Sequence, residues 1–379
     1  MDRARDLAER GRYTAAPNPL VGAAVVRGGR VIGEGFHARA GEEHAEVAAL
    51  RDCGGAPNEA RGATLYVTLE PCNHHGRTPP CTEAIIRAGV SRVVVGHLDP
   101  DPRMRGRSVE LLRGAGIEVE VTGDSALVGE LDRQNEQFFH YMATGRPFVH
   151  VKLAMTLDGR ISSGGERERI TGDDSRSRVH LLRAEAGAVL VGARTARADD
   201  PLLNARDLPP DTSPPAITRV VLDPSLSLDP GSRLAGAARE EPVVVFGGEA
   251  SFDGREGALR ELGVEAVPAP ARGGDEGELD LGFVLDELGR RGLRGLLVEG
   301  GGETVGRFAQ AGLVDKMTLF YAPRLIGADG VPAVGRLKTL KAARTPGPSG
   351  FKVENLERFG EDVALTLYPS GPSSERKGA

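Results

Sequence analysis

The sequence lacks several features that mark common protein classes. Its 379 residues include three cysteines and no tryptophan, and three thiols are too few for the paired framework of a secreted domain, which predicts a reducing, cytoplasmic setting. No apolar run approaches the roughly 20 residues that cross a bilayer. The polar start, MDRARDLAERGRY, lacks the apolar core of a signal peptide. We therefore expect no membrane contact.

Positive charge is not in excess either. The chain carries 48 Lys and Arg against 54 Asp and Glu, which gives a net charge of −6. A broad basic face for nucleic acid is therefore not expected, and the partner should be a small molecule. The length exceeds that of a typical single domain, so two domains are predicted.

Strands and helices alternate in the first part of the chain. Apolar β-branched runs around a Gly-Gly turn predict a hairpin over 20–36, and helices are expected where HAEVAALRDCG and PPCTEAIIRAG end at glycine. The order αββαβαβαβ implies a sheet covered by helices. One long amphipathic helix is expected over 125–147, and its Gly-Arg-Pro end places a domain boundary near residue 145.

A second alternating run follows, from FVHVKLAMTLDGRI to EDVALTLYP, and predicts a second α/β domain over 146–368. Two segments rich in proline and glycine, 207–215 and 266–279, are predicted to be surface loops. The last residues, 369–379, have the composition of a disordered tail.

The stretch EPCNHHGRTPPC (70–81) holds two of the three cysteines, and GEEHAEVAAL lies upstream. His44, Cys72 and Cys81 would give zinc three ligands and leave a fourth position open, which is the pattern of a catalytic site. Glu46, two residues after the histidine, could move protons beside the metal. The order H-x-E and then P-C…C is that of zinc-dependent base deaminases, although eight residues separate the cysteines here instead of two.

Two plainer interpretations stay open at this point. Cys72 and Cys81 could be ordinary buried thiols. They could also belong to a closed structural zinc site with His74 or His75 as its fourth ligand. Neither interpretation explains Glu46.

The segment between the cysteines carries a family resemblance. NHHGRTPP, with PNPLVGAAVV (17–26), GFHARAGEEHAEVAAL (35–50) and DPDP (99–102), resembles the bifunctional deaminase/reductase of riboflavin biosynthesis. The resemblance implies a cytidine-deaminase-like αβα domain over 1–145, with zinc on the three ligands above and Glu46 as proton shuttle. It also implies substrate contacts from Asn18, His37, His74 and Arg77.

Three pieces of the second half extend the resemblance to about residue 368. KLAMTLDGRI (152–161), VGARTARADDPLLNAR (191–206) and LLVEGGGETVGRF (296–308) are similar to the reductase half of that family, which has a dihydrofolate-reductase-like α/β fold and uses NADPH. The glycine-rich turn by itself also suits a pyrophosphate, because backbone N–H groups and the helix dipole face it. The resemblance implies cofactor contacts from Ala154, Thr195, Asp199, Gly301 and Gly302, and substrate contacts from Arg183, Leu203, Arg206 and Glu299.

The chain departs from the family just before Ile-Thr-Gly. Where the family commonly has Ser-x-Trp, RERITG (167–172) places Arg167 and Arg169. Arg167 then takes a substrate-contact position and Arg169 a cofactor position, where its planar guanidinium could stack or pair with a 2′-phosphate. Ser108 stands where the family usually has the second glycine of a Gly-x-Gly turn.

The resemblance implies two consecutive reactions. A zinc hydroxide deaminates a diaminopyrimidinone that carries a ribosylamino 5′-phosphate, and NADPH then reduces the ribosyl group to ribityl. Copies of the chain would pair through the reductase domain. Two alternatives stay open: a nucleic-acid base deaminase with an accessory domain, and a nucleotide-sensing protein with a structural zinc. The missing tryptophan leaves open a third, in which only the deaminase half is active.

Overall fold

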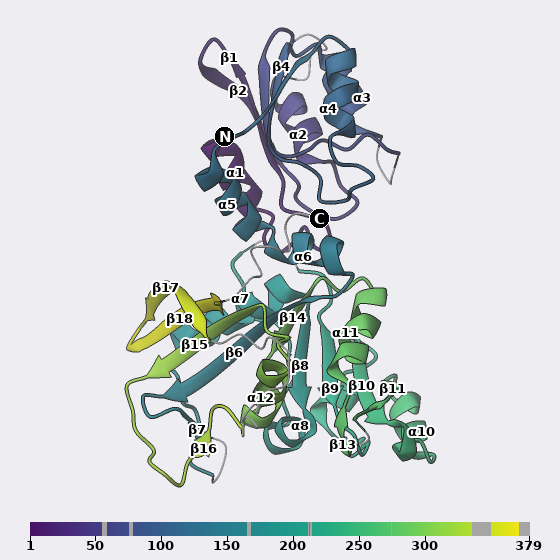
Figure 1. Ribbon diagram of the computed structural model, residues 1–379, viewed down its shortest axis with the longest axis vertical. Coiled ribbons are helices and arrows are strands. Elements are labelled where there is room, and N and C mark those ends of the chain that lie inside the picture. Colours follow the sequence, from purple (N-terminus) through teal and green to yellow (C-terminus); the bar gives the residue numbers. More distant parts are fainter. Residues whose placement is uncertain are drawn as a thin grey trace. The chain divides into compact units, whose positions relative to one another are not determined.

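The computed structural model describes residues 1–54, 59–75, 79–164, 168–210, 212, 214–273, 275–335 and 350–370. The chain divides into two compact units, Met1–Gly145 with Thr212–Pro214, and Arg146–Asp211 with Pro215–Ala379 (Figure 1). Gly145 adopts a left-handed conformation with φ 70°, which ends the last helix of the first unit. No described helix combines the length and the apolar character needed to cross a membrane.

The first unit is a five-stranded sheet between two layers of helices. The strand order is β2-β1-β3-β4-β5, with β1 antiparallel to both neighbours and the other pairs parallel. The strands are β1 (Gly22–Arg27), β2 (Arg30–Phe36), β3 (Thr64–Leu69), β4 (Arg92–His97) and β5 (Glu118–Val121). The helices are α1 (Asp2–Glu9), α2 (Ala45–Asp52), α3 (Cys81–Ala88), α4 (Arg107–Gly114), α5 (Ser125–Gln134) and α6 (Glu136–Thr144).

Alternation along the strands decides which helices cover which face. On one face, α1 and α5 approach the sheet closely. A Cβ on Gly22 would collide with the backbone of Ala4 in α1, and a Cβ on Gly96 would collide with the Leu131 side chain in α5. The other face carries an apolar core shared by β1, β3 and β4 with α2, α3 and α4. The predicted αβα layering is confirmed, and α2 and α3 come to lie on the same face.

The single helix predicted over 125–147 is wrong. The structure breaks it at Asn135, which has φ −114° and ψ 22°. The Asn135 amide accepts the Leu20 N–H at 2.7 Å and donates to the Leu20 carbonyl at 2.9 Å. Because this pairing joins residues far apart in the sequence, the local pattern of apolar residues did not reveal the break.

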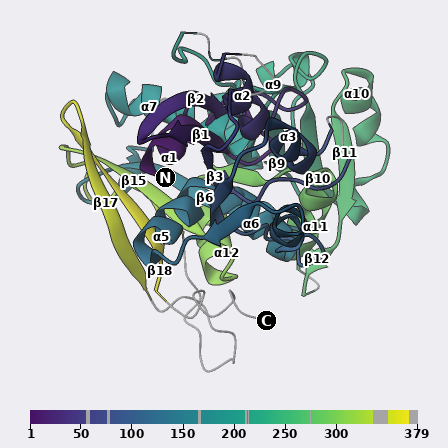
Figure 2. The ribbon, with the colours of Figure 1, turned by 90° about the horizontal axis from the view of Figure 1, so that it is seen from above.

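The second unit is built on a nine-stranded sheet in the order β11-β10-β9-β8-β14-β6-β15-β18-β17, and Figure 2 shows β10–β11 and β17–β18 at its opposite edges. The strands from β11 to β15 run parallel, and β18 pairs antiparallel with both β15 and β17. In sequence order the sheet's strands are β6 (Phe148–Thr156), β8 (Ala188–Gly192), β9 (Thr218–Leu222), β10 (Val243–Gly248), β11 (Glu265–Ala269), β14 (Gly295–Val298), β15 (Lys316–Ala322), β17 (Phe351–Phe359) and β18 (Asp362–Pro369).

Helices cover both faces of this sheet as well. Residues of α11 and α12 share one core with Leu190 and Leu296, whereas residues of α7 to α10 share the other with Val189 and Leu297. The helices are α7 (Asp173–Ala186), α8 (Ala193–Asp199), α9 (Arg233–Gly236), the 3₁₀ turn Glu249–Ser251, α10 (Arg255–Glu261), α11 (Leu281–Arg290) and α12 (Gly302–Gln310). Two small ribbons complete the unit, β7 (Arg160–Ser162) with β16 (Val331–Pro332) and β12 (Ala271–Arg272) with β13 (Asp275–Leu279).

The loop predicted over 266–279 is wrong, because β11, β12 and β13 occupy most of it. Pro268 lies in β11, and β11 is an edge strand, where a residue without an N–H removes no sheet hydrogen bond on the open side. The predicted loop over 207–215 forms no helix or strand in its described residues. Of the predicted tail, 371–379 lies outside the described residues.

Gly35→Ala is expected to destabilise the first unit. A Cβ on Gly35 of β2 would lie 2.4 Å from the Ala45 carbonyl oxygen and 2.4 Å from the Ala49 nitrogen, both in the backbone of α2. We expect the free energy of unfolding to fall by about 1–3 kcal/mol, and zinc to bind more weakly because α2 must shift. Denaturant unfolding and zinc titration measure the two effects. Gly129→Ala, whose Cβ meets no atom within 4 Å, is the control, and an equal loss there would contradict the argument.

Candidate active sites

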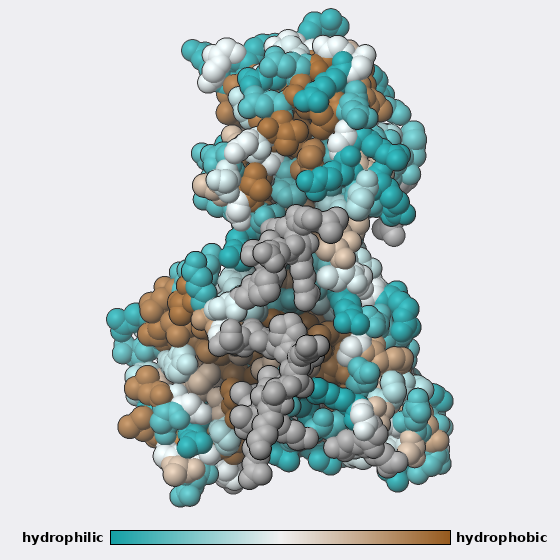
Figure 3. Space-filling view, in the orientation of Figure 1, coloured by the Kyte–Doolittle hydropathy of each residue, from teal (hydrophilic) through white to brown (hydrophobic). Residues whose placement is uncertain are grey.

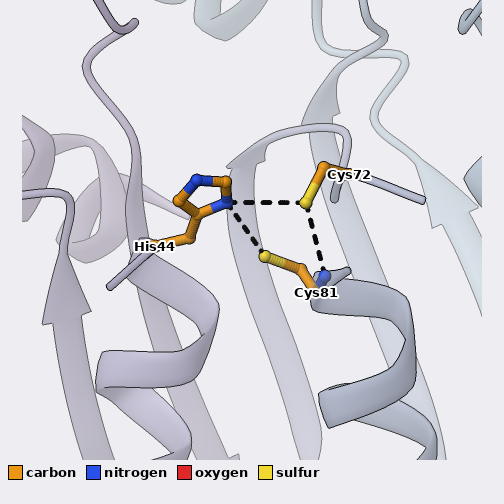
Figure 4. A group of neighbouring side chains, drawn as sticks. All are labelled: His44, Cys72 and Cys81. Atoms are coloured by element: carbon orange, nitrogen blue, oxygen red, sulfur yellow. Dashed lines mark hydrogen bonds between the residues drawn. The ribbon is translucent and has the colours of Figure 1, made fainter. Parts of the chain in front are cut away.

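Three side chains from different elements of the first unit converge on one point. His44 precedes α2, Cys72 follows β3 and Cys81 opens α3 (Figure 4). The His44 Nδ1 atom lies 3.2 Å from the Cys81 Sγ atom and 3.5 Å from the Cys72 Sγ atom. Within the described ranges, this is the one group of acidic, histidine or cysteine side chains close enough to hold a metal ion.

The cluster fits a tetrahedral zinc. Zinc bonds of about 2.3 Å to sulfur and 2.0 Å to nitrogen separate a nitrogen and a sulfur ligand by roughly 3.5 Å. The two nitrogen–sulfur distances agree with that value, and all three ligand atoms lie within 4.8 Å of one another. Neither His74 nor His75 belongs to the cluster; both are exposed, and His75 lies 3.4 Å from Glu83. A closed four-ligand site built on either histidine therefore gains no support.

Local structure favours a thiolate on Cys72, whereas the hydrogen bond with Cys72 and burial raise the pKa of the Cys81 thiol. Cys81 is the first residue of α3, where the helix dipole favours a negative charge. The Cys81 backbone N–H donates to the Cys72 sulfur at 3.3 Å. Hydrogen bonds from Cys81 and His44 lower the pKa of the Cys72 thiol to about 4, which favours the thiolate that zinc requires.

Glu46 lies in the first turn of α2 and is 3% exposed. Burial raises the pKa of its carboxyl to about 7, and the carboxyl shares a hydrogen bond with the Cys81 thiol. The sequence predicted this residue to act beside the metal, and the structure places it against a ligand of the cluster.

Of the residues predicted to contact the deaminase substrate, the structure places some beside the metal cluster and others not. His37 Nε2 lies 2.9 Å from the Asn18 amide nitrogen, and His37 Nδ1 lies 3.0 Å from the Glu43 carbonyl oxygen. Burial lowers the pKa of His37, and its ring packs edge-on against His44 at 5.3 Å. Asn18 and His37 thus lie beside the cluster. His74 is exposed, and the prediction for Arg77 lies outside the described residues.

The second unit contains a cavity of about 1570 Å³ at the carboxyl ends of β8, β9, β10 and β14. Of the predicted cofactor residues, Thr195, Asp199, Gly301 and Gly302 line it, whereas Ala154 and Arg169 do not. A Cβ on Gly302 would lie 2.4 Å from the Pro332 carbonyl oxygen, so this turn requires glycine. The glycine turn opens α12, and its bare backbone fits a dinucleotide pyrophosphate.

The predicted substrate residues of this unit meet around one loop. Arg183 binds Glu299 through two hydrogen bonds of 2.5 and 2.9 Å and donates to the Asn204 carbonyl at 2.9 Å. Leu203 is buried with φ 53°, and Arg206 donates to the Asn204 side chain at 3.2 Å. The Arg183 guanidinium therefore faces the Glu299 carboxylate, although the sequence had suggested that it binds a sugar phosphate. Arg167 lies outside the described residues.

Two residues at this site escaped the sequence analysis. Lys152 lies on β6 with 15% of its side chain exposed and its Nζ atom 4.0 Å from Glu299, and removal from solvent lowers its pKa. A lysine inside the apolar strand FVHVKLAMT was a signal that could have revealed it. His180, one helical turn before Arg183 on α7, lies 3.1 Å from the Asn204 carbonyl oxygen through Nδ1 and gave no such signal.

Fold and cluster together define the class. An αβα unit with a His/Cys/Cys zinc site and a buried glutamate is a zinc deaminase domain of the cytidine-deaminase type. Residues 1–97 match the model described as "Cytidine and deoxycytidylate deaminase zinc-binding region", and residues 147–365 match "RibD C-terminal domain".

Relatives of known name match nearly the whole chain. The riboflavin biosynthesis protein RibD of Aquifex aeolicus is 40% identical, over 96% of this chain and 96% of its own, and that of Escherichia coli is 38% identical over 97% and 98%. Acinetobacter baumannii RibD superposes with a TM-score of 0.82, at 36% identity over 97% of each chain. The chain therefore belongs to the RibD family.

A further solved structure carries both activities in its name. It is a diaminohydroxyphosphoribosylaminopyrimidine deaminase/5-amino-6-(5-phosphoribosylamino)uracil reductase from Thermotoga maritima. It has a TM-score of 0.80 and 36% identity, over 98% of this chain and 97% of its own.

Proposed function

We propose that the first unit deaminates a diaminopyrimidinone bearing a ribosylamino 5′-phosphate, and that the second unit reduces the sugar of the product with NADPH. The observation that carries this proposal is the His44–Cys72–Cys81 cluster with buried Glu46 against it. The two reactions named for the Thermotoga maritima relative assign one to each unit.

Different residues of the deaminase site have different roles in the hydrolytic deamination. Zinc on the cluster would supply the Lewis acidity that makes water nucleophilic near neutral pH. Water adds to the amino-bearing carbon and ammonia leaves, so Glu46 takes a proton from the water and delivers it to the leaving nitrogen. Asn18, oriented by His37 at 2.9 Å, offers its remaining amide groups to the pyrimidine. Burial of Glu46 keeps bulk water from competing for that proton.

The residues of the reductase site position the reactants and donate a proton. NADPH in the cavity would supply the hydride. Hydride addition to the ring-opened sugar places an electron pair on the neighbouring heteroatom, which must then be protonated. The Lys152 ammonium lies 4.0 Å from Glu299, the residue that precedes the glycine turn, and we assign the donation of that proton to it. Arg183 keeps Glu299 ionised, because its guanidinium lowers the pKa of that carboxyl.

Pairing of two copies through the second unit belongs to the same proposal. Strand β17 is the free edge of the nine-stranded sheet, and its Val353 and Leu356 side chains are 51% and 63% exposed. Figure 3 shows apolar residues gathered over the β17–β18 hairpin. An exposed apolar edge strand of this kind is a template for another chain. The predicted cytoplasmic location and the predicted absence of a nucleic-acid partner stay predictions.

A paired assay tests the two activities together. Zinc-loaded protein is given the ribosylamino pyrimidine phosphate with NADPH, and ammonia release and NADPH oxidation are followed in one tube. We expect both, with oxidation lagging ammonia, because the second unit acts on the product of the first. Ammonia without oxidation would remove the reductase half of the proposal. Neither signal, at one bound zinc per chain, would favour a structural zinc.

A further inference from the structure

The order of the strands indicates which end of a bound dinucleotide would lie at which part of the cavity in the second unit. Lys152 lies on β6 and Glu299 directly after β14, and the glycine turn and α8 follow β14 and β8. The cavity lining includes the glycine turn, residues of α8, and residues 222–225 and 248–251 from the ends of β9 and β10. The order β10-β9-β8-β14-β6 means that a dinucleotide with its pyrophosphate on the glycine turn and its nicotinamide toward Lys152 extends its adenosine to the ends of β9 and β10.

Arginines line the cavity, and their partners differ. Arg194 and Arg307 lie 3.5 and 2.9 Å from the single carboxylate of Glu303, so each has an acidic partner within the protein. Arg197 of α8 donates at 3.1 Å to the hydroxyl of Ser227, a neutral group in the loop after β9. Arg197 therefore brings a positive charge to the adenosine end of the cavity.

Asp223, the acidic residue that follows β9 at the adenosine end of the cavity, is not available to bind a ribose hydroxyl. In many dinucleotide-binding sites an acidic residue near a strand end binds the ribose 2′-hydroxyl and selects NAD. Asp223 follows β9 and lines the cavity, but it is 0% exposed. Its carboxylate accepts hydrogen bonds from the Ser227 hydroxyl at 3.0 Å and the Leu228 N–H at 2.8 Å. Glu249, exposed after β10, also lines the cavity, so a phosphate bound here needs a cation beside it.

We infer that Arg197 makes this enzyme select NADPH over NADH by pairing with the 2′-phosphate. A guanidinium fork suits phosphate oxygens, and the pair forms at the mouth of a cavity where Asp223 is already satisfied. The inference rests on the proposed use of a nicotinamide dinucleotide. It gives Arg197 a role that the sequence had suggested for Arg169, whose side chain is exposed and does not line the cavity.

The test is binding of two adenosine fragments to the full-length protein, measured by calorimetry without turnover. Adenosine 2′,5′-bisphosphate and AMP differ only in the 2′-phosphate. We expect the wild type to prefer the bisphosphate, Arg197→Ala to lower that preference about tenfold or more, and Arg197→Lys to restore part of it. Arg169→Ala and Arg260→Ala, at an exposed arginine that is not among the cavity's lining residues, should keep the wild-type preference.

The outcomes separate the inference from the function on which it rests. Unchanged preference in Arg197→Ala overturns the inference alone, and a loss confined to Arg169→Ala transfers the role to that residue and overturns it equally. A wild type that binds neither fragment overturns the proposed dinucleotide site and the inference with it.

Discussion

Glu46→Gln is expected to lower the rate of ammonia release by about 10²- to 10⁴-fold, the usual contribution of a positioned acid–base group. The amide keeps the size and the burial of the side chain but cannot take a proton from water. The zinc content should stay at one per chain, because Glu46 is not among the cluster's three ligands. Steady-state ammonia release and elemental analysis of the purified variant measure the two quantities.

The matched control is Glu110→Gln, an exposed glutamate in the first turn of α4 in the same unit. Its ammonia release should equal that of the wild type. Full ammonia release by Glu46→Gln would contradict the assigned proton transfer. Zinc loss in Glu46→Gln would instead mean that the carboxylate supports the metal, so both measurements are needed.

Lys152→Met is expected to lower NADPH oxidation by at least about 100-fold while ammonia release continues. Methionine fills the volume of the lysine stem and removes the ammonium. Glu299 keeps its two hydrogen bonds to Arg183 at 2.5 and 2.9 Å, so no charge is left unpaired by the change. Coupled measurement of ammonia and NADPH in one sample shows whether only the second reaction is lost.

A control variant and a variant of the neighbouring arginine test this second prediction further. Lys352→Met, on exposed β17, should leave both reactions unchanged. Arg183→Met removes the main partner of buried Glu299 and should cost about 3–5 kcal/mol of stability, which thermal unfolding would detect. NADPH oxidation at the wild-type rate in Lys152→Met would remove lysine from the mechanism.

The signals that predict the first site are local in the sequence. His44 and Glu46 stand two residues apart at a helix start, and the cysteines flank the start of the next helix. Metal chemistry restricts which residue types can share such a site, so type and spacing together named the cluster. The alternation of strands and helices likewise predicted an αβα unit before any contact was known.

Much of the rest depends on pairs far apart in the chain. Asn135 breaks a helix by bonding Leu20, 115 residues away, and Arg183 turns to Glu299, 116 residues away. Strand β11 forms despite its proline because it lies at a sheet edge. The amino-acid sequence by itself predicted most of the elements, a His/Cys/Cys cluster and the family, since these follow from periodicity and residue chemistry over short spans. Only the tertiary structure decided which charges meet, because burial makes an unpaired ion costly and the fold alone brings its partner into reach.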